Sequence, residues 1–285
     1  MEDSPRANAD WTQIIKSKRS WFQVNLNDLW SYRDLVFLFV KRDFVSQYKQ
    51  TLLGPFWHIV QPIATTFLFT VVFGIIAKIP TEGPSGLFYL SGLVLWNFFS
   101  GNILTTASTF VTNASIFGKV YFPRLVVPIA TIISGSIRLA IQFGLFLLFL
   151  SYYLIRGTGG VHLTIYAAFL PLLILILSLL SLGFGLLVSS VTTKYRDLSI
   201  LLGVGLQLMM YLTPVIYPVA IWKNFGWIMK MNPLTPVIEM FRYGMMGVGA
   251  PHPEGLLYSI VFSIVVLVAG VLLFNRVEQN FIDTI

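Results

Sequence analysis

Six long apolar stretches run through the chain and constrain its fold more than any other feature. Each is close to or above the ~20 residues that cross the hydrocarbon core of a bilayer. The stretches cover residues 57–77, 87–111, 126–155, 162–191, 198–219 and 256–274. They predict an all-α integral membrane protein with six transmembrane helices.

Charge is almost absent from these stretches, which together contain Arg138 and no Asp, Glu or Lys. Ionisable groups are costly inside a bilayer, and those that persist usually carry function. A transporter driven by ions, or an enzyme acting within the membrane, would keep more of them. We therefore expect a conduit that takes its energy from another protein. Arg138 itself either meets a diphosphate or carboxylate or sits in a polar crevice between helices.

The distribution of Lys and Arg predicts the orientation. Thirteen of them lie before the first span, in the second and fourth loops and on the tail, whereas the other loops hold five. We therefore predict a multi-pass plasma-membrane protein with both termini in the cytoplasm. Residues 1–26 are predicted to form a polar cytoplasmic segment, and they show no signal-peptide pattern. The net charge of +7 follows this asymmetry and favours anionic lipids over nucleic acid.

Residues 27–54 are too charged to span and predict an amphipathic interface helix. On a helical projection, aromatic and apolar residues share one face and polar residues the other. The first face holds Trp30, Phe37, Val40, Phe44 and Tyr48, and the second holds Arg42, Ser46 and Lys49. Such a helix lies in the membrane interface, where it serves as a lipid anchor or as a docking element for a cytoplasmic partner.

Two loops on the cytoplasmic side are candidates for contact with a partner. In residues 112–128, Asn113 or Ser115 can cap one short helical turn before Pro123 returns the chain to the bilayer. This segment is either an ordinary tight loop or a rigid lever, that is, an element that transmits movement of a bound partner to the second and third spans. In the fourth loop, the adjacent Arg196 and Asp197 can neutralise each other or clamp a helix end.

Prolines divide residues 213–247 into apolar pieces of about a dozen residues, each covering about half a bilayer core at 1.5 Å per residue. We expect external re-entrant half-helices between the fifth and sixth spans that line or plug an exit. Pro214 and Pro218 break the chain there, and Glu239 and Arg242 are spaced to form an ion pair on one helical face.

Enzyme chemistry is not indicated. The chain has no cysteine, its three histidines lack metal-ligand spacing, and its carboxylates are scattered. No G-x-x-x-x-G-K-[ST] phosphate-binding loop occurs, so we expect neither a metal nor another cofactor on this chain, with ATP and Mg²⁺ bound by a separate subunit.

Five motifs carry a family resemblance, in this order along the chain. They are VKRDFVSQYKQTLLGPFWHIVQP at 40–62, NASIFGKVYFPRLVVP at 113–128, KYRDLSILLG at 194–203, LTPVIYPV at 212–219 and NPLTPVIEMFR at 232–242. Together they resemble the permease subunits of ABC type-2 exporters of the polysaccharide and polyol-phosphate export group. Residues 55–285 would then form the transmembrane domain.

The resemblance implies a homodimer with two ABC ATPase subunits bound beneath it. Contacts to the ATPases would come from the interface helix and from the second and fourth loops. These contact residues would be Arg42, Lys49, Ile116, Phe117, Lys119, Tyr121, Arg196 and Asp197.

The implied cargo is a lipid-linked polysaccharide such as O-antigen, capsule or teichoic acid, and an exporter of drugs or other small amphiphiles is the alternative. Aromatic rings present flat apolar faces to sugars but also serve helix packing and lipid interfaces. Candidate channel residues are Trp57, Phe69, Phe73, Trp96, Phe99 and Tyr211.

Overall fold

The computed structural model describes residues 26–49, 51–52, 54–120, 122–192, 195, 197–221 and 226–281, and the regular structure within these ranges is entirely helical. The polar segment predicted at 1–26 lies almost wholly outside them. The α-helices are α1 (Leu26–Ser31), α2 (Arg33–Tyr48), α3 (Trp57–Phe69), α4 (Ser85–Ala107), α5 (Thr109–Thr112), α6 (Ala114–Phe117), α7 (Val126–Arg156), α8 (Leu170–Thr192), α9 (Leu198–Tyr211), α10 (Gly226–Met231), α11 (Thr235–Met246) and α12 (Pro253–Phe281). Short 3-10 helices cover Gly54–Phe56, Ile165–Phe169 and Val219–Ile221, and a π-helix, Thr70–Ile76, continues α3.

Five helical segments are long and apolar enough to cross a membrane. They are Gly54–Ile76, Ser85–Ala107, Val126–Arg156, Ile165–Thr192 and Pro253–Val277. Five of the six predicted spans therefore have a long helix in the expected place. The fifth prediction, 198–219, was too long, because α9 ends at Tyr211 after 14 residues. Pro214 accounts for the early end, since it lacks an N–H donor and disfavours helical geometry at Thr213.

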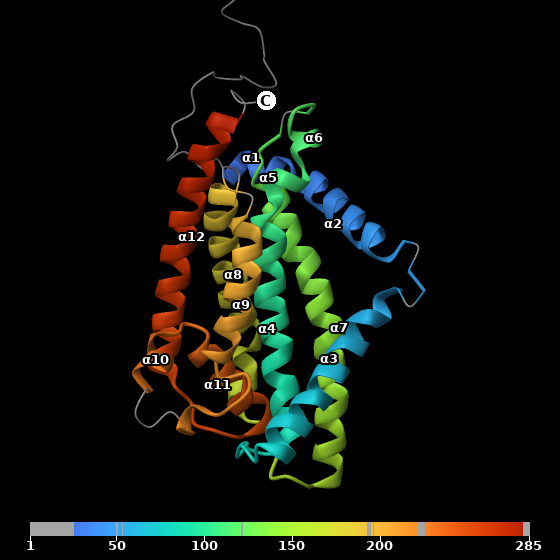
Figure 1. Ribbon diagram of the computed structural model, residues 1–285, viewed down its shortest axis with the longest axis vertical. Coiled ribbons are helices and arrows are strands. Elements are labelled where there is room, and N and C mark those ends of the chain that lie inside the picture. Colours follow the sequence, from blue (N-terminus) through green and yellow to red (C-terminus); the bar gives the residue numbers. More distant parts are fainter. Residues whose placement is uncertain are drawn as a thin grey trace, which may run out of the picture.

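The helices form an elongated bundle with different structures at its two ends (Figure 1). One end carries α1, α2, α5 and α6 together with the C-terminal part of α12, and the other carries α10 and α11. Helix α4 is the central element: most of its side chains are buried, and it packs against α3, α7, α8, α9 and α11. The N-terminal helices, the second loop and the end of α12 thus share one end of the bundle, as the charge pattern predicted.

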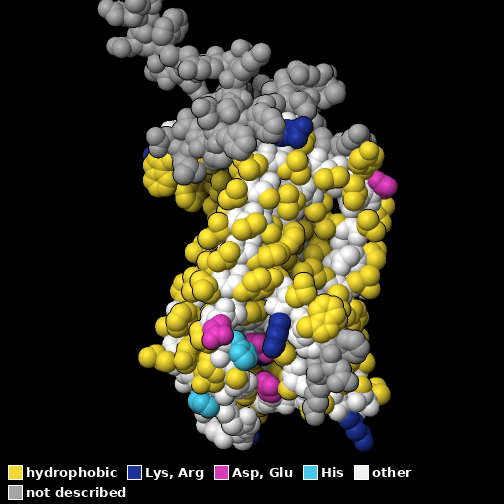
Figure 2. All heavy atoms as spheres, turned by 90° about the vertical axis from the view of Figure 1, so that its left-hand side faces the viewer, with side chains coloured by type: hydrophobic (Ala, Val, Ile, Leu, Met, Phe, Trp, Pro, Cys, Tyr) yellow, Lys and Arg dark blue, Asp and Glu magenta, His cyan; other side chains and the backbone are white. Residues whose placement is uncertain are grey.

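Apolar side chains cover the middle of the bundle surface, while most charged side chains gather toward the ends of the face drawn in Figure 2. Exposed apolar residues such as Phe67, Leu148, Leu201 and Val265 come from α3, α7, α9 and α12. A soluble protein of this size would not expose so much apolar surface. An apolar belt between polar ends fits a bilayer instead.

Glycine allows a close contact between α8 and α12. A Cβ atom built on Gly183 would lie 2.7 Å from the backbone nitrogen of Leu267, and one on Gly270 would lie 2.5 Å from the carbonyl oxygen of Gly183. The two backbones touch because neither residue has a side chain, which is how small residues promote helix packing in membranes.

We expect Gly183→Ala to destabilise the protein by about 1–3 kcal/mol, because the added methyl group must push two helix backbones apart. Gly203→Ala is the matched control. It lies in α9, where a Cβ atom would have no neighbour within 4 Å, so the better helix propensity of alanine should leave stability unchanged or slightly higher. Thermal unfolding in detergent measures both, and equal melting temperatures would contradict the close contact.

Candidate functional site

Arg242 joins three elements at the α10–α11 end of the bundle. Its side chain leaves α11 and is only 2% exposed. Nε donates a hydrogen bond to Ser91 Oγ (3.0 Å) and Nη2 to the carbonyl oxygen of Phe88 (3.2 Å), both on α4. Toward the segment after α9, Nη1 donates to the Pro214 carbonyl (2.6 Å) and Nη2 to that of Val215 (3.1 Å). We call Arg242 and these four acceptors the Arg242 lock.

Packing around the lock explains why a guanidinium fits there. The Cζ atom of Arg242 lies 3.6 Å from the centroid of the Phe88 ring, a cation–π distance. Gly92 leaves the space for the head group, since a Cβ atom there would lie 2.9 Å from Arg242 Nη2 and 3.0 Å from the Cα of Val215. Burial lowers the pKa of Arg242 to about 9, so the group stays charged at pH 7.

The four predicted gate residues meet at this place, but not as an ion pair. Pro214 accepts a hydrogen bond in the lock, and Pro218, Glu239 and Arg242 line one small cavity with Glu82. The predicted Glu239–Arg242 ion pair was wrong, because backbone carbonyls and Ser91 take the donors of Arg242. Glu239 Oε2 lies 3.9 Å from Nε2 of His252, and burial raises the pKa of Glu239.

Hydrogen bonds connect the described parts of the segment between α9 and α11 with one another and with α12. The Asn232 amide nitrogen donates to the carbonyl of Leu212 (3.0 Å) and to Thr213 Oγ1 (2.9 Å). Ser259 of α12 donates to the carbonyl of Pro233 (2.7 Å), and the amide of Thr164 donates to the carbonyl of Gly244 (3.0 Å). Helix α11 is thereby bound to its neighbours on several sides.

At the opposite end, a chain of phenylalanine rings connects the N-terminal helices with the spans. Phe39 of α2 lies 5.6 Å from Phe122 between ring centroids, Phe122 lies 5.7 Å from Phe117, and Phe117 lies 6.0 Å from Phe110. Phe110 then stacks on Phe274 of α12 at 4.5 Å. These five rings, which we call the phenylalanine relay, are all buried, so packed side chains connect α2 and the second loop with α12.

Arg42 connects α2 with the second loop directly. Its Nη1 donates to the side-chain oxygen of Asn113 (3.2 Å), while Nε and Nη2 donate to Asp43 Oδ1 (2.9 and 2.8 Å). The Asn113 amide nitrogen donates to the carbonyl of Thr109 (3.1 Å). Asn113 precedes α6 as predicted, but its side chain makes no cap hydrogen bond because it is engaged by Arg42 and Thr109.

The surface of α2 differs from the predicted amphipathic division. Val36, Phe39 and Val40 face the bundle, whereas Phe37 and Phe44 are exposed on another face of α2. Trp30 is exposed as well, but it lies in α1. The predicted apolar face is therefore divided, because Val40 is buried against protein while these three aromatic residues are exposed.

The other predicted partner-contact residues fall into three groups. Lys49, Lys119 and Asp197 are exposed, Ile116 is half-buried, and Phe117 is buried in the phenylalanine relay. Little of the Phe117 side chain is therefore accessible at this surface. Tyr121 and Arg196 lie outside the described residues.

The predicted channel aromatics do not form one surface. Phe69, Trp96 and Phe99 are 7%, 6% and 1% exposed and pack in the main hydrophobic core, so they present no face to cargo here. Phe73 packs against the same core. Trp57 and Tyr211 are about half exposed, at 52% and 44%. Aromatic residue type alone does not separate core from channel positions.

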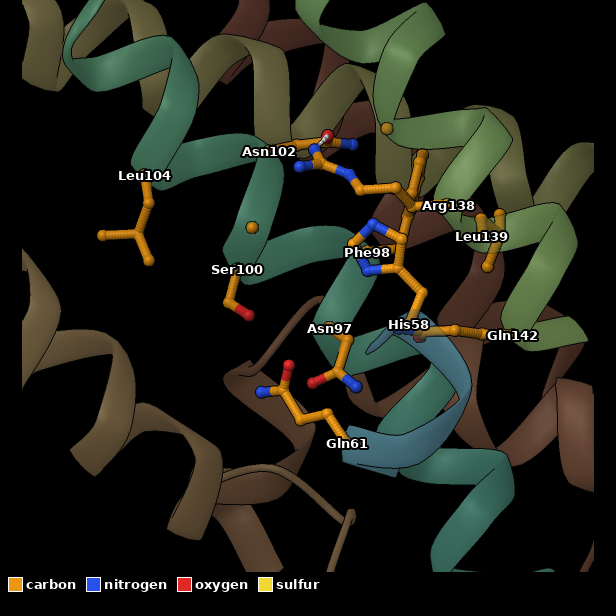
Figure 3. A pocket seen from close by; sticks show the side chains of 12 residues that line it. His58, Gln61, Asn97, Phe98, Ser100, Asn102, Leu104, Arg138, Leu139 and Gln142 are labelled. Atoms are coloured by element: carbon orange, nitrogen blue, oxygen red, sulfur yellow. Dashed lines mark hydrogen bonds between the residues drawn. The ribbon is translucent and has the colours of Figure 1, made fainter. Parts of the chain in front are cut away.

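Arg138 lines a polar cavity between α3, α4 and α7 (Figure 3), the polar crevice that was one of its two predicted settings, although the other polar residues of this cavity were not predicted. Its volume is about 260 Å³. Seven of its lining residues are polar: His58, Gln61, Asn97, Ser100, Asn102, Arg138 and Gln142. The sequence did carry a signal, because Asn97, Ser100 and Asn102 interrupt one span, and only the fold shows that they line one cavity with Arg138.

Comparison with known proteins assigns the family. Residues 34–246 match the ABC-2 type transporter family, and the chain belongs to it. It is 24% identical over 251 residues to an O-antigen export system permease protein RfbA of Klebsiella pneumoniae, covering 88% of this chain and 94% of that one.

Two further relatives match over similar lengths. The chain is 23% identical over 265 residues to an O-antigen export system permease protein RfbA of Myxococcus xanthus, covering 91% and 98% of the two chains. It is 26% identical over 243 residues to the polysialic acid transport protein KpsM of Escherichia coli, covering 84% and 91%. The fold is therefore that of a membrane permease of the ABC-2 type.

Arg242→Met should destabilise the protein by about 3–5 kcal/mol, because it leaves four buried acceptors without their charged donor. Arg156→Met on α7 is the control, since Arg156 is exposed and its loss should cost less than about 0.5 kcal/mol. Exchanging Glu239 and Arg242 should not restore stability, because they do not pair. Melting temperatures in detergent test this, and recovery in the exchanged protein would contradict the geometry.

Proposed function

We propose that the chain is the membrane-spanning subunit of an ATP-driven exporter that moves a lipid-linked polysaccharide out of the cytoplasm. The observation that carries the proposal is the near full-length match to proteins named for O-antigen export and polysialic acid transport, two different glycans. The five long spans hold a single carboxylate, Glu254 at the very start of α12. This scarcity and the polar cavity fit a passage that is driven from outside the chain.

The proposed topology has six membrane crossings, with α9 as the fifth. Its 14 residues rise about 21 Å at 1.5 Å per residue, and the segment that follows, together with α10 and α11, forms a re-entrant external structure. The α1, α2, α5 and α6 end faces the cytoplasm of the inner membrane, along with both termini. The excess of Lys and Arg in these segments supports this orientation.

The proposed assembly is a homodimer with two ABC ATPase subunits. ATP and Mg²⁺ are bound by the ATPases, and this chain holds neither cofactor nor metal. Support comes from the described geometry: Lys49, Lys119 and Asp197 are exposed, and the phenylalanine relay and the Arg42–Asn113 hydrogen bond connect α2 and the second loop with the spans. Movement of an ATPase bound to this surface would be transmitted to α5, α7 and α12 through buried contacts.

Export of drugs or other small amphiphiles is the competing function within the same family. It would need the same fold and the same ATPase contacts. The relatives favour the polysaccharide, because each is named for a glycan system.

Deleting the gene tests the cargo. We expect a surface polysaccharide to disappear while its lipid-linked form accumulates inside the cell, and the wild-type gene should restore it. Sugar analysis of the cell surface and of extracted lipid measures both pools. An unchanged surface glycan combined with greater sensitivity to amphiphilic drugs would support the competing function instead.

Lys119→Glu should uncouple ATP hydrolysis from export. The residue is exposed beside the phenylalanine relay, so charge reversal should disturb partner contact without unfolding the chain. We expect export to fall about tenfold, the effect of losing ~1.4 kcal/mol of coupling, while the complex still hydrolyses ATP. Lys230→Glu on α10 is the control at the opposite end. Normal export by Lys119→Glu would show that this loop is not the lever.

A further inference from the structure

We propose that the cavity around Arg138 binds the phosphate group of a membrane lipid. The site is formed by α3, α4 and α7, and Figure 3 shows the side chains of His58, Asn102 and Arg138 converging on it. This binding does not require the transported cargo to be a glycan.

Arg138 has donors that the protein does not use. A guanidinium offers five N–H donors in a planar fork that matches phosphate oxygens. The Arg138 side chain makes one hydrogen bond in the described structure, from Nη2 to the side-chain oxygen of Asn102 at 3.5 Å. A charge inside a membrane span is costly unless it is paired. A bound anion would give Arg138 both an opposite charge and acceptors for its unused N–H groups.

Two polar atoms near Arg138 also lack hydrogen-bond partners within the described residues. Asn102 is 0% exposed, and its amide nitrogen has no hydrogen-bond partner within the described residues. His58 Nε2 is buried without a partner as well. Gly135 allows Asn102 to approach α7, because a Cβ atom there would lie on the Asn102 side chain. Buried polar groups without partners are uncommon in native proteins and call for a ligand or water.

The charge balance of the cavity selects an anion. No carboxylate lines it among the described residues, whereas Arg138, His58 and three amide side chains besides Asn102 can all donate. Asp43 on α2 attracts Arg138 electrostatically, but Asp43 Oδ1 accepts two hydrogen bonds from Arg42 and forms its ion pair there at 2.8 Å. In the part of the chain that the structure describes, Arg138 forms no ion pair.

The position of the cavity suits a lipid headgroup. His58 is the second residue of α3, and Asn102 lies five residues before the end of α4, or about 8 Å at 1.5 Å per residue. The cavity is therefore close to the membrane surface at the α2 end. Gln61 and Leu104 on its rim are exposed. At about 260 Å³ it is slightly smaller than pockets for drug-sized ligands, roughly 300–1,000 Å³.

The test uses the full chain in nanodiscs of neutral phosphatidylcholine and a photoreactive polyprenyl phosphate as probe. We expect Arg138→Gln to reduce labelling at least about tenfold, as loss of a charge-assisted hydrogen bond predicts, and Arg138→Lys to retain most of it. Arg156→Gln, near the other end of the same helix, should label like the wild type. Equal labelling of wild type and Arg138→Gln, or equal loss in Arg156→Gln, would overturn the site.

Competition identifies the source of the phosphate. Displacement by unlabelled polyprenyl phosphate alone indicates a glycan carrier, and equal displacement by phosphatidylglycerol indicates a general anionic-lipid site. Displacement by inorganic diphosphate at the same concentration would mean a soluble anion and would overturn the lipid assignment. Surface glycan is measured separately. An Arg138→Gln protein that does not bind the probe but still exports glycan normally would show that export does not need this site, and it would leave the proposed function intact.

A second approach keeps Arg138 and does not depend on the folding of its variants. The chain has no cysteine, so Gln61→Cys introduces a single thiol on the rim of the cavity. A thiol-reactive lipid phosphate should label it about tenfold faster than Ile63→Cys, which is exposed two residues further along α3 and, at about 100° per residue, faces away from Gln61. Equal rates would contradict binding at the cavity.

Discussion

Buried polar groups without water must find partners within the protein, and three arginines of the described bundle illustrate this constraint. At one end, Arg242 gives its donors to Ser91 and to three backbone carbonyls, which allows α11 and the irregular segment after α9 to sit against α4. At the other end, Arg42 and Asn113 hold α2 on the second loop. Between them, Arg138 lies within a span with one long hydrogen bond to Asn102, which leaves most of its donors unused.

Helix α4 connects the Arg242 lock with the polar cavity around Arg138. It carries Phe88 and Ser91 at the lock, Asn102 at the polar cavity, and the carbonyl of Ala107, which accepts a hydrogen bond from Thr192 Oγ1 at 2.9 Å. Because α4 is mostly buried and packs on five neighbouring helices, its two ends cannot shift independently. Under the proposed function, this central helix would be the physical connection between the surface that contacts the ATPase and the opposite end of the bundle.

The sequence predicted the helices better than their contacts. Long apolar runs fix where spans occur, since length and hydropathy are local properties, and Pro214 alone explains the misjudged end of α9. Side-chain partners depend on tertiary packing. The spacing of Glu239 and Arg242 suggested an ion pair, yet Arg242 bonds to carbonyls more than twenty residues away. Phe69, Trp96 and Phe99 looked like channel residues by type, but they fill the core. The role of Asn102 could not be predicted from the sequence, because it depends on the close approach of α7 at Gly135.

The Arg242 lock has a consequence for how α11 can separate from α4. Four hydrogen bonds and the Phe88 ring all converge on a single head group, so withdrawing it breaks every one of them together. Such a contact has no stable half-way position, because it is either complete or lost. In the proposed exporter, any opening at this end would therefore be abrupt rather than gradual.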